Sequence, residues 1–544
     1  MIVLGISGSV TLGAQDASAV IVKQNKVIFA QEEERFTRMK YGVSTLPLLS
    51  IKNGLKYCNL NIQDIDIVAY YSEYYNLRHR LKAYFLHHFN YCPKIVFKNH
   101  HLCHAASSFY ASGFKESCIL TADFSGDGIS TGLYYAKNGS IKKYKLFKKP
   151  QSLGIFYSLI TQLLGFRRDS DEYKVMGMSS YGKPKNDLSW LIKKNSDGYL
   201  LNENYIKRLN LSGNFLLPTK QEPIYKEKIL KKIPFKTTNI KNYTSNHFNF
   251  AASAQKSLND IALNLIKKLY KKFNSQNLCI AGGVGLNCVM NQAILKSQIF
   301  KNVFVQPAAG DSGAALGAAY LVSNDHGYKF NKLEHVYLGN SFSNRSIEKS
   351  LKNASLKFKR VKNPEKIAAE LLAKNKIVGW FQGRHEFGPR ALGSRSILAN
   401  PKKKEMKDLI NKKVKFREEF RPFAPSCLEE DIEDFFSIRN FEKYSFMTFV
   451  VDVKKEKRKK IPSVVHIDGT ARLQSVSIKQ NKKFYKLISE FKKKTKIPMI
   501  LNTSFNVNRE PIVNTPEQAI AAFCSTGMDA LLIGNYYLNK KTNF

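Results

Sequence analysis

Short apolar runs separated by polar or glycine-rich turns open the chain, and the same order returns from residue 118 onward. The first set has apolar runs at 2–6, 17–22 and 27–30, with a glycine-rich turn at 7–13 and a polar turn at 25–26. The second set has apolar runs at 118–122 and 132–136, with a glycine-rich turn at 123–128 and the hairpin signal Asn138-Gly139. Apolar runs joined by such turns predict β-hairpins. Their recurrence favours an internal duplication over two unrelated hairpins.

Helical periodicity alternates with short strands in the region that follows. One face of an amphipathic helix is marked by Leu258, Ile261, Ala262, Leu265, Ile266 and Leu269. Strand and turn sequences come next at 278–285 and 303–313, and the second runs into an alanine-rich helix that ends at Val322. Strands that alternate with helices through glycine-rich crossovers predict an α/β fold. Residues 185–249 are rich in lysine and asparagine with weak periodicity, which indicates a peripheral insertion.

Length and composition predict two domains in the cytoplasm. A chain of 544 residues exceeds one ordinary hydrophobic core, and we expect a first domain at 1–345 and a second at 355–544. An apolar content of 43 % excludes global disorder. The eight cysteines form no CxxC pair, which indicates thiols in a reducing compartment. No apolar run approaches the roughly 20 residues that span a bilayer, and residues 1–7 read as a strand rather than a signal peptide.

The formal net charge of +43 is compatible with a nucleic acid or an anionic membrane as partner. However, the lysines are spread over the whole chain, and runs such as 454–460 are short. A solvated lysine-rich surface is therefore favoured over a dedicated polyanion groove.

Histidine and aspartate side chains in the first domain predict a metal site. His100 and His104 are four residues apart, so on a helix both imidazoles lie on one face. Asp123 follows one apolar strand and Asp311 follows another, each at a glycine-rich turn. Two imidazoles with two carboxylates suit Fe²⁺, Mn²⁺ or Zn²⁺ better than Ca²⁺ or Cu⁺, and such a metal would act as a Lewis acid. An HxxxH pair alone is weak evidence, and clustered histidines without a metal are the alternative.

Arginines gather in glycine- and proline-punctuated loops of the second domain. The segments are QGRHEFGPRALGSRS at 382–396, KFREEFRPFAP at 415–425, HIDGTAR at 466–472 and NTSFN at 502–506. A guanidinium group binds two phosphate oxygens through paired hydrogen bonds and keeps its positive charge at ordinary pH. These loops therefore favour a ligand with more than one phosphate. Surface salt bridges are the alternative, but few acids stand nearby. RNA is the rival polyanion, and the chain has no RNP-like strand motif.

With these residues in view, the sequence resembles the O-carbamoyltransferases of the nodulation-factor, cephamycin and aminoglycoside type. The resemblance runs from Gly5 to Asn535 and is carried by motifs at residues 16, 32, 100, 123, 172, 282 and 308 (DASA, EEERFTR, HHLCHAASSF, DFSGDG, EYKVMGMSSYG, GGVGLN and AAGDSGAALGAA), and by the four arginine-domain segments. It implies an amino-terminal domain of the actin, Hsp70 and sugar-kinase type and a YrdC-like carboxy-terminal domain. It also implies that carbamoyl phosphate and ATP give a carbamoyl adenylate, which then carbamoylates a substrate hydroxyl. Enclosing both steps in one protein would keep water from this labile anhydride.

The resemblance implies roles for particular residues. An iron-type metal would be held by His100, His104, Asp123 and Asp311. Carbamoyl phosphate and ATP, the latter with Mg²⁺, would be bound by Arg384, Arg390, Lys415, Arg417, Arg421, Arg472, Asn502 and Asn506. The adenylate would be bound in the first domain by Gly282, Gly283 and Asn287, with Lys40 and Lys174 flanking it.

Some positions depart from the family pattern. Related sequences have His-Asp where this chain has Gln15-Asp16, and histidine where Tyr41 follows Lys40. We therefore expect catalysis to rest on Lys40, Asp16 and His101, with the metal. His385 stands where an uncharged residue is common, which would add pH sensitivity.

The expected acceptor is a hydroxyl of a sugar, glycolipid or secondary metabolite, and a homodimer fits the family. A tRNA-modifying carbamoyl transferase, which the positive charge favours, is the alternative. A non-enzymatic nucleotide-binding regulator is a third reading, and the intact arginine loops argue against it.

Overall fold

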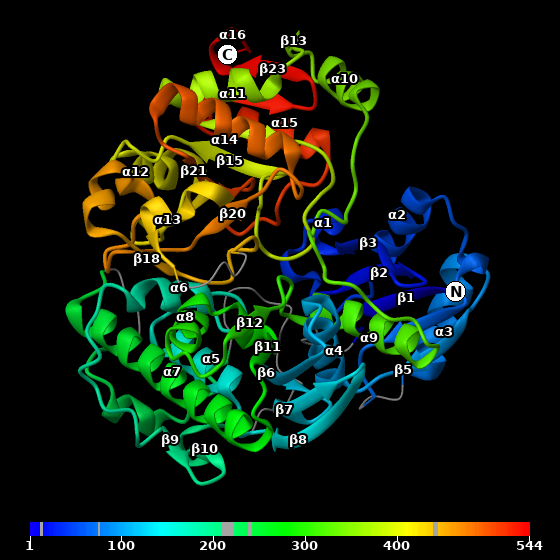
Figure 1. Ribbon diagram of the computed structural model, residues 1–544, viewed down its shortest axis with the longest axis vertical. Coiled ribbons are helices and arrows are strands. Elements are labelled where there is room, and N and C mark those ends of the chain that lie inside the picture. The colour runs from blue at the N-terminus through cyan, green and yellow to red at the C-terminus, as the bar shows by residue number, and fades with distance from the viewer. Residues whose placement is uncertain (11–14, 74–76, 208–221, 238–241, 439–443, 544) are drawn as a thin grey trace. The chain divides into compact units, whose positions relative to one another are not determined.

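The computed structural model describes residues 1–10, 15–73, 77–207, 222–237, 242–438 and 444–543. The chain forms two compact units (Figure 1). Unit 1 comprises Met1–Ile28 and Gly42–Leu333, and unit 2 comprises Phe29–Tyr41 and Glu334–Phe544. Part of the glycine-rich turn predicted at 7–13 lies outside the described residues.

Two five-stranded sheets built on one plan organise unit 1, and the edge strand β3 of the first sheet continues into unit 2 from Phe29 onward. The first has the order β3-β2-β1-β4-β5, and the second has the order β8-β7-β6-β11-β12. In each sheet an antiparallel pair, β1–β2 or β6–β7, is followed by two strands added in parallel. The strands of the first sheet are β1 (Ile2–Ser7), β2 (Ser18–Lys23), β3 (Lys26–Glu32), β4 (Ile67–Tyr70) and β5 (Lys94–Phe97). Those of the second are β6 (Glu116–Gly126), β7 (Ile129–Lys137), β8 (Ser140–Lys148), β11 (Asn277–Ala281) and β12 (Asn302–Val305). The shared order confirms the predicted duplication.

Two helices lie between these sheets. α9 (Asp311–Asp325) packs on β1, β2 and β4, whereas α4 (His100–Ser112) packs on β6 and β11 and against α9 (Figure 1). This close approach needs small residues: a methyl group at Gly317 would collide with the Cys103 carbonyl oxygen, and one at Gly5 with that of Ala315. The alanine-rich sequence of α9 therefore sets the spacing between the helices that carry the candidate metal ligands.

Unit 1 has six further α-helices in its described residues. They are α2 (Leu48–Cys58), α3 (Arg78–Phe89), α5 (Leu153–Leu163), α6 (Glu172–Ser179), α7 (Ser245–Phe273) and α8 (Cys288–Lys296). The helix that periodicity predicts is α7, which buries all the apolar positions expected on its inner face. It packs on β6 and β7. The described part of 185–249 includes the hairpin of β9 (Ile192–Asn195) and β10 (Gly198–Leu201).

Unit 2 is built on a mixed sheet of eight strands in the order β13-β23-β22-β14-β15-β21-β16-β20. They are β13 (Lys359–Arg360), β14 (Val378–Phe381), β15 (Arg395–Ala399), β16 (Ala424–Leu428), β20 (Gln474–Val476), β21 (Met499–Ser504), β22 (Ala530–Ile533) and β23 (Tyr536–Asn539). A small sheet holds β17 (Phe436–Ser437), β18 (Val451–Val453) and β19 (Thr470–Ala471). α14 packs on β21, β16 and α11 (Figure 1). The helices are α1 (Glu34–Thr37), α10 (Asn344–Asn353), α11 (Pro364–Ala373), α12 (Met406–Ile410), α13 (Ile432–Phe435), α14 (Lys482–Thr495), α15 (Pro516–Ser525) and α16 (Lys540–Asn543).

Across the described residues, no helix combines the length and the apolar character needed to cross a bilayer.

Candidate metal centre and anion site

Four predicted metal ligands meet in unit 1. His100 and His104 lie one turn apart on α4, which begins there because the Asn99 side chain caps it by accepting a hydrogen bond from Leu102 N at 3.2 Å. Asp123 lies on β6 and Asp311 opens α9. One potential ligand atom from each of the four residues lies within 4.8 Å of the other three. The duplicated sheets and their central helices thus bring together residues far apart in sequence.

The distances within this cluster fit a bound cation. His104 Nε2 lies 3.0 Å from Asp123 Oδ2, 3.3 Å from Asp311 Oδ1 and 3.1 Å from His100 Nε2. His100 Nε2 lies 3.5 Å from Asp123 Oδ2 and 3.6 Å from Asp311 Oδ1. Ligands about 2.1 Å from one ion stand roughly 3.0–3.5 Å apart in tetrahedral or octahedral geometry. The four side chains therefore fit a divalent transition metal.

Electrostatics within the cluster point the same way. Burial alone would lower the pKa of His104, but hydrogen bonds to Asp123 and Asp311 and their charges outweigh it and raise that pKa to about 9. Burial likewise opposes ionisation of Asp123, yet its hydrogen bonds with both histidines hold the pKa of Asp123 well below its usual range. The site is thus strongly attractive to positive charge. His104 Nδ1 is buried and has no hydrogen-bond partner among the described residues.

Glycines leave room for these ligands. A methyl group at Gly126 would overlap the His100 ring, and one at Gly283 would lie 3.0 Å from Asp123 Oδ1. One at Gly310 would lie 2.5 Å from Asp16 Oδ2. The predicted catalytic residue Asp16 thus lies beside the residue that precedes Asp311.

His101 faces away from this chemistry. Its ring nitrogens lie 2.8 Å from Thr121 Oγ1 and 3.1 Å from the Ile129 carbonyl oxygen, and the residue is fully buried. Burial and the neighbouring histidines hold the pKa of His101 well below its usual value. With both nitrogens occupied, His101 is placed to support α4 rather than to receive a substrate proton.

The predicted adenylate-binding residues divide into two groups. Gly282 has φ 89°, and a methyl group there would collide with the Ala122 carbonyl oxygen, so the chain needs glycine beside β6. Gly282 and Gly283 lie next to the metal cluster. Asn287 instead caps α8 by accepting from Met290 N at 2.9 Å, and it exchanges hydrogen bonds with Gln255. Lys174 is buried, with its ammonium 3.3 Å from Asp171 Oδ2.

In unit 2, Lys415 is the centre of a cationic cluster. The buried Lys415 ammonium donates to Ser504 O at 2.8 Å, Asn506 O at 2.8 Å and Asn506 Oδ1 at 2.5 Å. Burial and the charges of Arg417, Arg421 and Lys40 hold its pKa well below the usual range. Arg417 is fixed by a 2.7 Å hydrogen bond to Asn411 Oδ1 and by the Phe423 ring, 4.6 Å away. We call Lys415, Arg417 and Arg421, with Asn506, the anion site.

Other predicted phosphate ligands have partners within the protein. Arg384 donates to the carbonyl oxygens of Gly339, at 3.0 Å, and Leu338. Asn502 Nδ2 lies between Ala391 O, Ser426 Oγ and Gln474 Oε1 at 3.0–3.2 Å. Arg472 is close enough to His466 for its charge to lower the pKa of that histidine, after the larger effect of burial.

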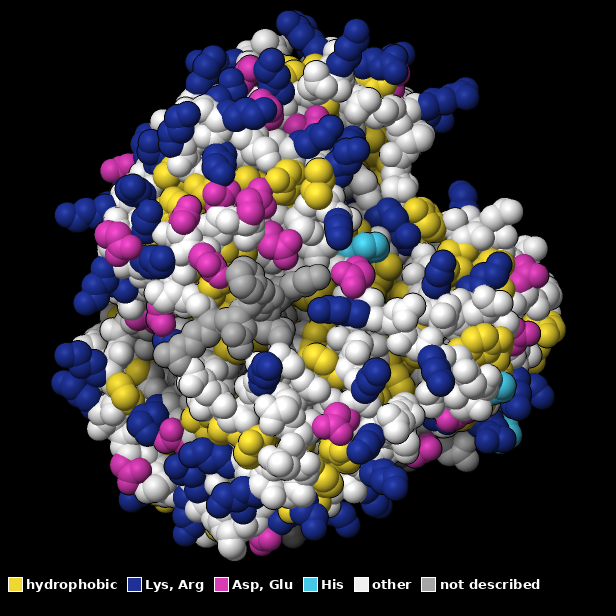
Figure 2. All heavy atoms as spheres, viewed as in Figure 1, with side chains coloured by type: hydrophobic (Ala, Val, Ile, Leu, Met, Phe, Trp, Pro, Cys, Tyr) yellow, Lys and Arg dark blue, Asp and Glu magenta, His cyan; other side chains and the backbone are white. Residues whose placement is uncertain are grey.

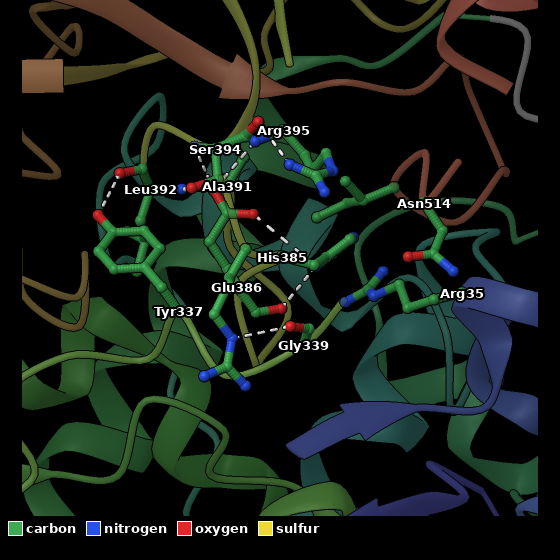
Figure 3. A network of polar contacts seen from close by, with 12 residues as sticks. Arg35, Tyr337, Gly339, His385, Glu386, Ala391, Leu392, Ser394, Arg395 and Asn514 are labelled. Atoms are coloured by element: carbon green, nitrogen blue, oxygen red, sulfur yellow. Dashed lines mark hydrogen bonds and ion pairs between the residues drawn. The ribbon is translucent and has the colours of Figure 1, made fainter. Parts of the chain in front are cut away.

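A buried polar network in unit 2 was not predicted (Figure 3). His385 lies between Arg395 on one side and Arg35 and Asn514 on the other. Its Nδ1 lies 2.7 Å from the Glu386 carbonyl oxygen, so Nδ1 carries the proton and donates. Arg395 is fully buried over the Phe381 ring and donates to the carbonyl oxygens of Gln382 and Gly383.

The residues of EEERFTR supply one side of this network. Glu32 Oε1 accepts from Gly388 N at 2.6 Å, and Arg35 donates to Gly388 O at 2.8 Å. Gln31 donates to Asn514 Oδ1 at 2.7 Å and accepts from Asn340 N at 2.9 Å. The family resemblance includes this motif but implies no role for it. The run of charged residues directly after an apolar strand was the one feature of the sequence that could have indicated a buried network.

Comparison with known proteins finds relatives that cover nearly the whole chain. Residues 75–320 match the family model described as carbamoyltransferase N-terminus, and residues 369–540 match carbamoyltransferase C-terminus. The chain is 38 % identical to nodulation protein NolNO of Sinorhizobium fredii over 97 % of this chain and 79 % of that protein. It is 33 % identical to an uncharacterized protein of Synechocystis over 99 % and 96 %. Nodulation protein U of Rhizobium tropici is 42 % identical over 43 % and 39 %.

Solved structures resemble the chain only distantly. HypF of T. kodakarensis is 13 % identical, with a TM-score of 0.38 over 61 % of this chain and 48 % of its own. Component A of the (R)-2-hydroxyglutaryl-CoA dehydratase of Acidaminococcus fermentans is 14 % identical, with a TM-score of 0.34 over 60 % and 98 %. The fold of unit 1 therefore rests on its own strand order.

Proposed function

This chain belongs to the carbamoyltransferase family, and on that premise we propose that it is an ATP-dependent O-carbamoyltransferase whose two units perform successive steps. The observation that supports this division is that each unit holds a site of different chemistry. Unit 2 gathers cations around Lys415, whereas unit 1 gathers His100, His104, Asp123 and Asp311.

We propose that unit 2 is a YrdC-like activation domain. Water releases phosphate from carbamoyl phosphate, and an oxygen of the resulting carbamate attacks the α-phosphorus of ATP. The bond to the β-phosphate breaks, so carbamoyl adenylate and pyrophosphate form. Lys415, Arg417 and Arg421 bind and neutralise the phosphates, and their fixed positions favour the charge that develops on the leaving pyrophosphate.

Unit 1, proposed as the actin-like transfer domain, then carries the second step. The acceptor hydroxyl attacks the carbamoyl carbon, AMP leaves, and Asp16 takes the hydroxyl proton. Gly282 and Gly283 let the adenylate approach the backbone beside Asp123. His100, His104, Asp123 and Asp311 would hold a divalent metal, which would supply Lewis-acid polarisation of an oxygen atom.

Pyrophosphate release separates the two steps. The wild-type protein should release pyrophosphate from ATP only when carbamoyl phosphate is present. Arg417→Ala should reduce this release about 100-fold or more, as removal of one fixed charge-stabilising donor does elsewhere. His104→Ala should retain release but lose transfer to the acceptor.

Arg345→Ala, which removes an exposed arginine of α10, is the matched control and should behave as wild type. Cleavage of ATP without carbamoyl phosphate, or equal loss of both steps in His104→Ala, would overturn the proposal.

The acceptor proposed is a hydroxyl of a small molecule or glycan. Figure 2 shows lysine and arginine side chains scattered over the visible face with acidic side chains between them, rather than gathered into one band. This scatter supports a small acceptor over a long nucleic acid, despite the charge of +43. Purified protein that retained tRNA through a high-salt wash would favour RNA instead.

A further inference from the structure

We propose that Asp127 is a positioning residue of the metal centre, whose carboxylate offsets the positive end of α4 and so allows a cation to bind beside that helix. Asp127 is not among the four candidate ligands, which are His100, His104, Asp123 and Asp311. This role rests on the metal centre of the proposed function and concerns unit 1 alone.

Both helices of the metal centre begin at one of its ligands. α4 begins at His100 and α9 begins at Asp311. The amino-terminal end of a helix carries a partial positive charge, equivalent to about half an elementary charge. Such an end attracts anions and opposes a bound cation. Asp311 brings a negative charge to the start of α9, whereas α4 begins with two histidines, so α4 needs a carboxylate from elsewhere.

Asp127 brings a carboxylate to the start of α4. The backbone N–H of His100 donates to Asp127 Oδ2 at 2.7 Å, and Asn99 Nδ2 lies 3.5 Å from the same oxygen. The uncharged side chain of Asn99 in turn caps Leu102 N. The backbone of His100 is thus bonded to Asp127 while its ring stands among the metal ligands. The Asp127 carboxylate therefore lies one residue away from a bound ion.

Neighbouring segments fix the position of this carboxylate. Ser72 Oγ donates to Asp127 Oδ1 at 2.5 Å, and Glu73 N donates to Oδ2 at 3.0 Å. Ser72 and Glu73 follow β4 of the first sheet, whereas Asp127 lies in the turn between β6 and β7 of the second. A methyl group at Gly126 would overlap the His100 ring, so this turn lies against both the ring and the backbone of His100. The negative charge is therefore held beside α4.

Two other charged side chains lie near this turn. The Lys98 ammonium pairs with Asp325 Oδ2 at 2.6 Å, and Asp325 is the last residue of α9, the end away from the metal centre. Burial, and then the charge of Asp127, raises the pKa of Glu73, while Lys98 acts in the opposite direction. In the described part of the chain, the Glu73 carboxylate makes no hydrogen bond or ion pair with α4. The carboxylate that meets the start of α4 is therefore that of Asp127.

The test is Co²⁺ binding to metal-free protein, measured for Asp127→Asn by competition with a coloured chelator. Asparagine keeps the shape and the hydrogen bonds, because its oxygen can accept from His100 N and its amide can donate to Ser72 Oγ, but it carries no charge. Asp127→Asn should weaken Co²⁺ binding about two- to thirtyfold, with an unchanged visible spectrum of the bound Co²⁺. Asp197→Asn, at an exposed aspartate between β9 and β10, is the matched control and should bind as wild type.

A second variant separates the charge from the hydrogen bonds. Asp127 has φ 50°, which glycine adopts without strain, so Asp127→Gly removes the whole side chain and keeps the turn. This variant frees His100 N as well as removing the charge. Asp127→Gly should therefore bind Co²⁺ more weakly than Asp127→Asn and alter its visible spectrum.

The outcomes distinguish the metal centre from the role of Asp127. Wild-type protein that binds no Co²⁺ would overturn the metal centre itself, and with it the transfer step proposed above. If wild type binds Co²⁺ and Asp127→Asn matches it, the charge of Asp127 does not act on the ion and its role alone is wrong. Weaker binding by Asp127→Asn with an altered spectrum would indicate displaced ligands instead of lost charge, and would also overturn this role.

Discussion

At the scale of single residues, the two sites are held together by opposite balances of charge. In the metal cluster each imidazole meets carboxylate oxygens, so opposite charges attract. In the anion site the Lys415 ammonium is satisfied by carbonyl and amide oxygens, and among its charged neighbours the cations, Arg417 and Arg421 foremost, outweigh the carboxylate of Glu510. A bound cation would complement the first arrangement and a bound anion the second, which accords with the two half-reactions proposed above.

Loss of one imidazole should empty the metal centre. His104→Ala removes the imidazole that lies closest to both carboxylates, at 3.0 and 3.3 Å. Asp123 and Asp311 then keep less positive charge beside them. We expect purified His104→Ala protein to contain less than about a tenth of the wild-type metal, since loss of a ligand costs at least as much affinity as loss of its support, about 10–100-fold. Elemental analysis measures this. His326→Ala, outside the cluster at the end of α9, should keep its metal; equal loss there would contradict the assignment.

His385 should make folding of the protein sensitive to mild acid. Burial, followed by the charges of Arg35 and Arg395, holds its pKa well below the usual 6.5. Below about pH 6.5 the unfolded chain therefore binds a proton at His385 and the folded chain does not. The free energy of unfolding then falls as the pH drops, by up to about 1.4 kcal/mol per pH unit. His385→Gln should make this fall shallower in denaturant unfolding at pH 7, 6 and 5. His79→Gln, at an exposed histidine, should not change the slope; an unchanged slope in His385→Gln would refute the argument.

Residue spacing predicted the metal cluster better than the arginine loops. The i, i+4 spacing of His100 and His104 fixes one helical face, so local geometry alone brings the two imidazoles together. An arginine in a glycine-rich loop can equally well bind a ligand or a carbonyl oxygen, and Arg384 and Arg395 do the latter. That choice depends on which backbone oxygens lie near, here those of residues 45 and 13 positions away along the chain, and spacing alone does not single them out.

At the scale of elements, the spacing of α4 and α9 decides whether the metal ligands meet. The two helices bring His104 and Asp311 together only because small residues line their contact. Alternating apolar runs and glycine-rich turns predicted the strands that flank these helices, and the repeated sheet order confirms the duplication. The predicted hairpins account for the antiparallel pairs, but the parallel strands of each sheet could not be predicted, because their pairing joins distant segments.

A single methyl group at the contact of α4 and α9 should disturb the metal centre. Gly317→Ala places a methyl against the Cys103 carbonyl oxygen, so α4 must shift. We expect a loss of about 1–3 kcal/mol in the free energy of unfolding, as overpacking costs elsewhere, together with reduced metal content. Gly285→Ala, where the nearest atom would lie 3.3 Å away, is the control and should cost less. Equal losses in both would show that this contact does not set the position of α4.

At the scale of the whole molecule, the chain does not divide at one point into its two units. Phe29–Tyr41 belongs to unit 2 although more than 290 residues of unit 1 separate it from Glu334, since unit 1 continues from Gly42 to Leu333. A linear reading of sequence places this segment in the first domain. The side chains that join this amino-terminal segment to unit 2, those of Gln31, Glu32, Arg35 and Arg38, are polar, and each has a partner beyond residue 338.

A fragment of residues 334–544 should therefore fold poorly. Without the amino-terminal segment, buried groups such as Gly388 N and Asn340 N lose their partners. Each orphaned polar group costs about 1–3 kcal/mol, which is large beside a total stability of about 5–15 kcal/mol. Near-ultraviolet circular dichroism should show weak tertiary structure, and fusion of residues 27–42 through a flexible linker should restore it. Fusion of the same residues carrying Arg35→Ala and Arg38→Ala should restore less; full folding of the bare fragment would refute the prediction.

The placement of the amino-terminal segment also bears on how the protein is made. Arg38 leaves the ribosome 474 residues ahead of the carbonyl of Ile512 that it binds. At about 5–20 residues per second, the segment waits roughly 25–95 seconds for its partner to be synthesised. A segment that contains EEERFTR can remain in water for that interval, because its charged side chains are hydrated and resist aggregation. The polar side chains that bind the segment to unit 2 thus also keep it hydrated until its partners have been synthesised.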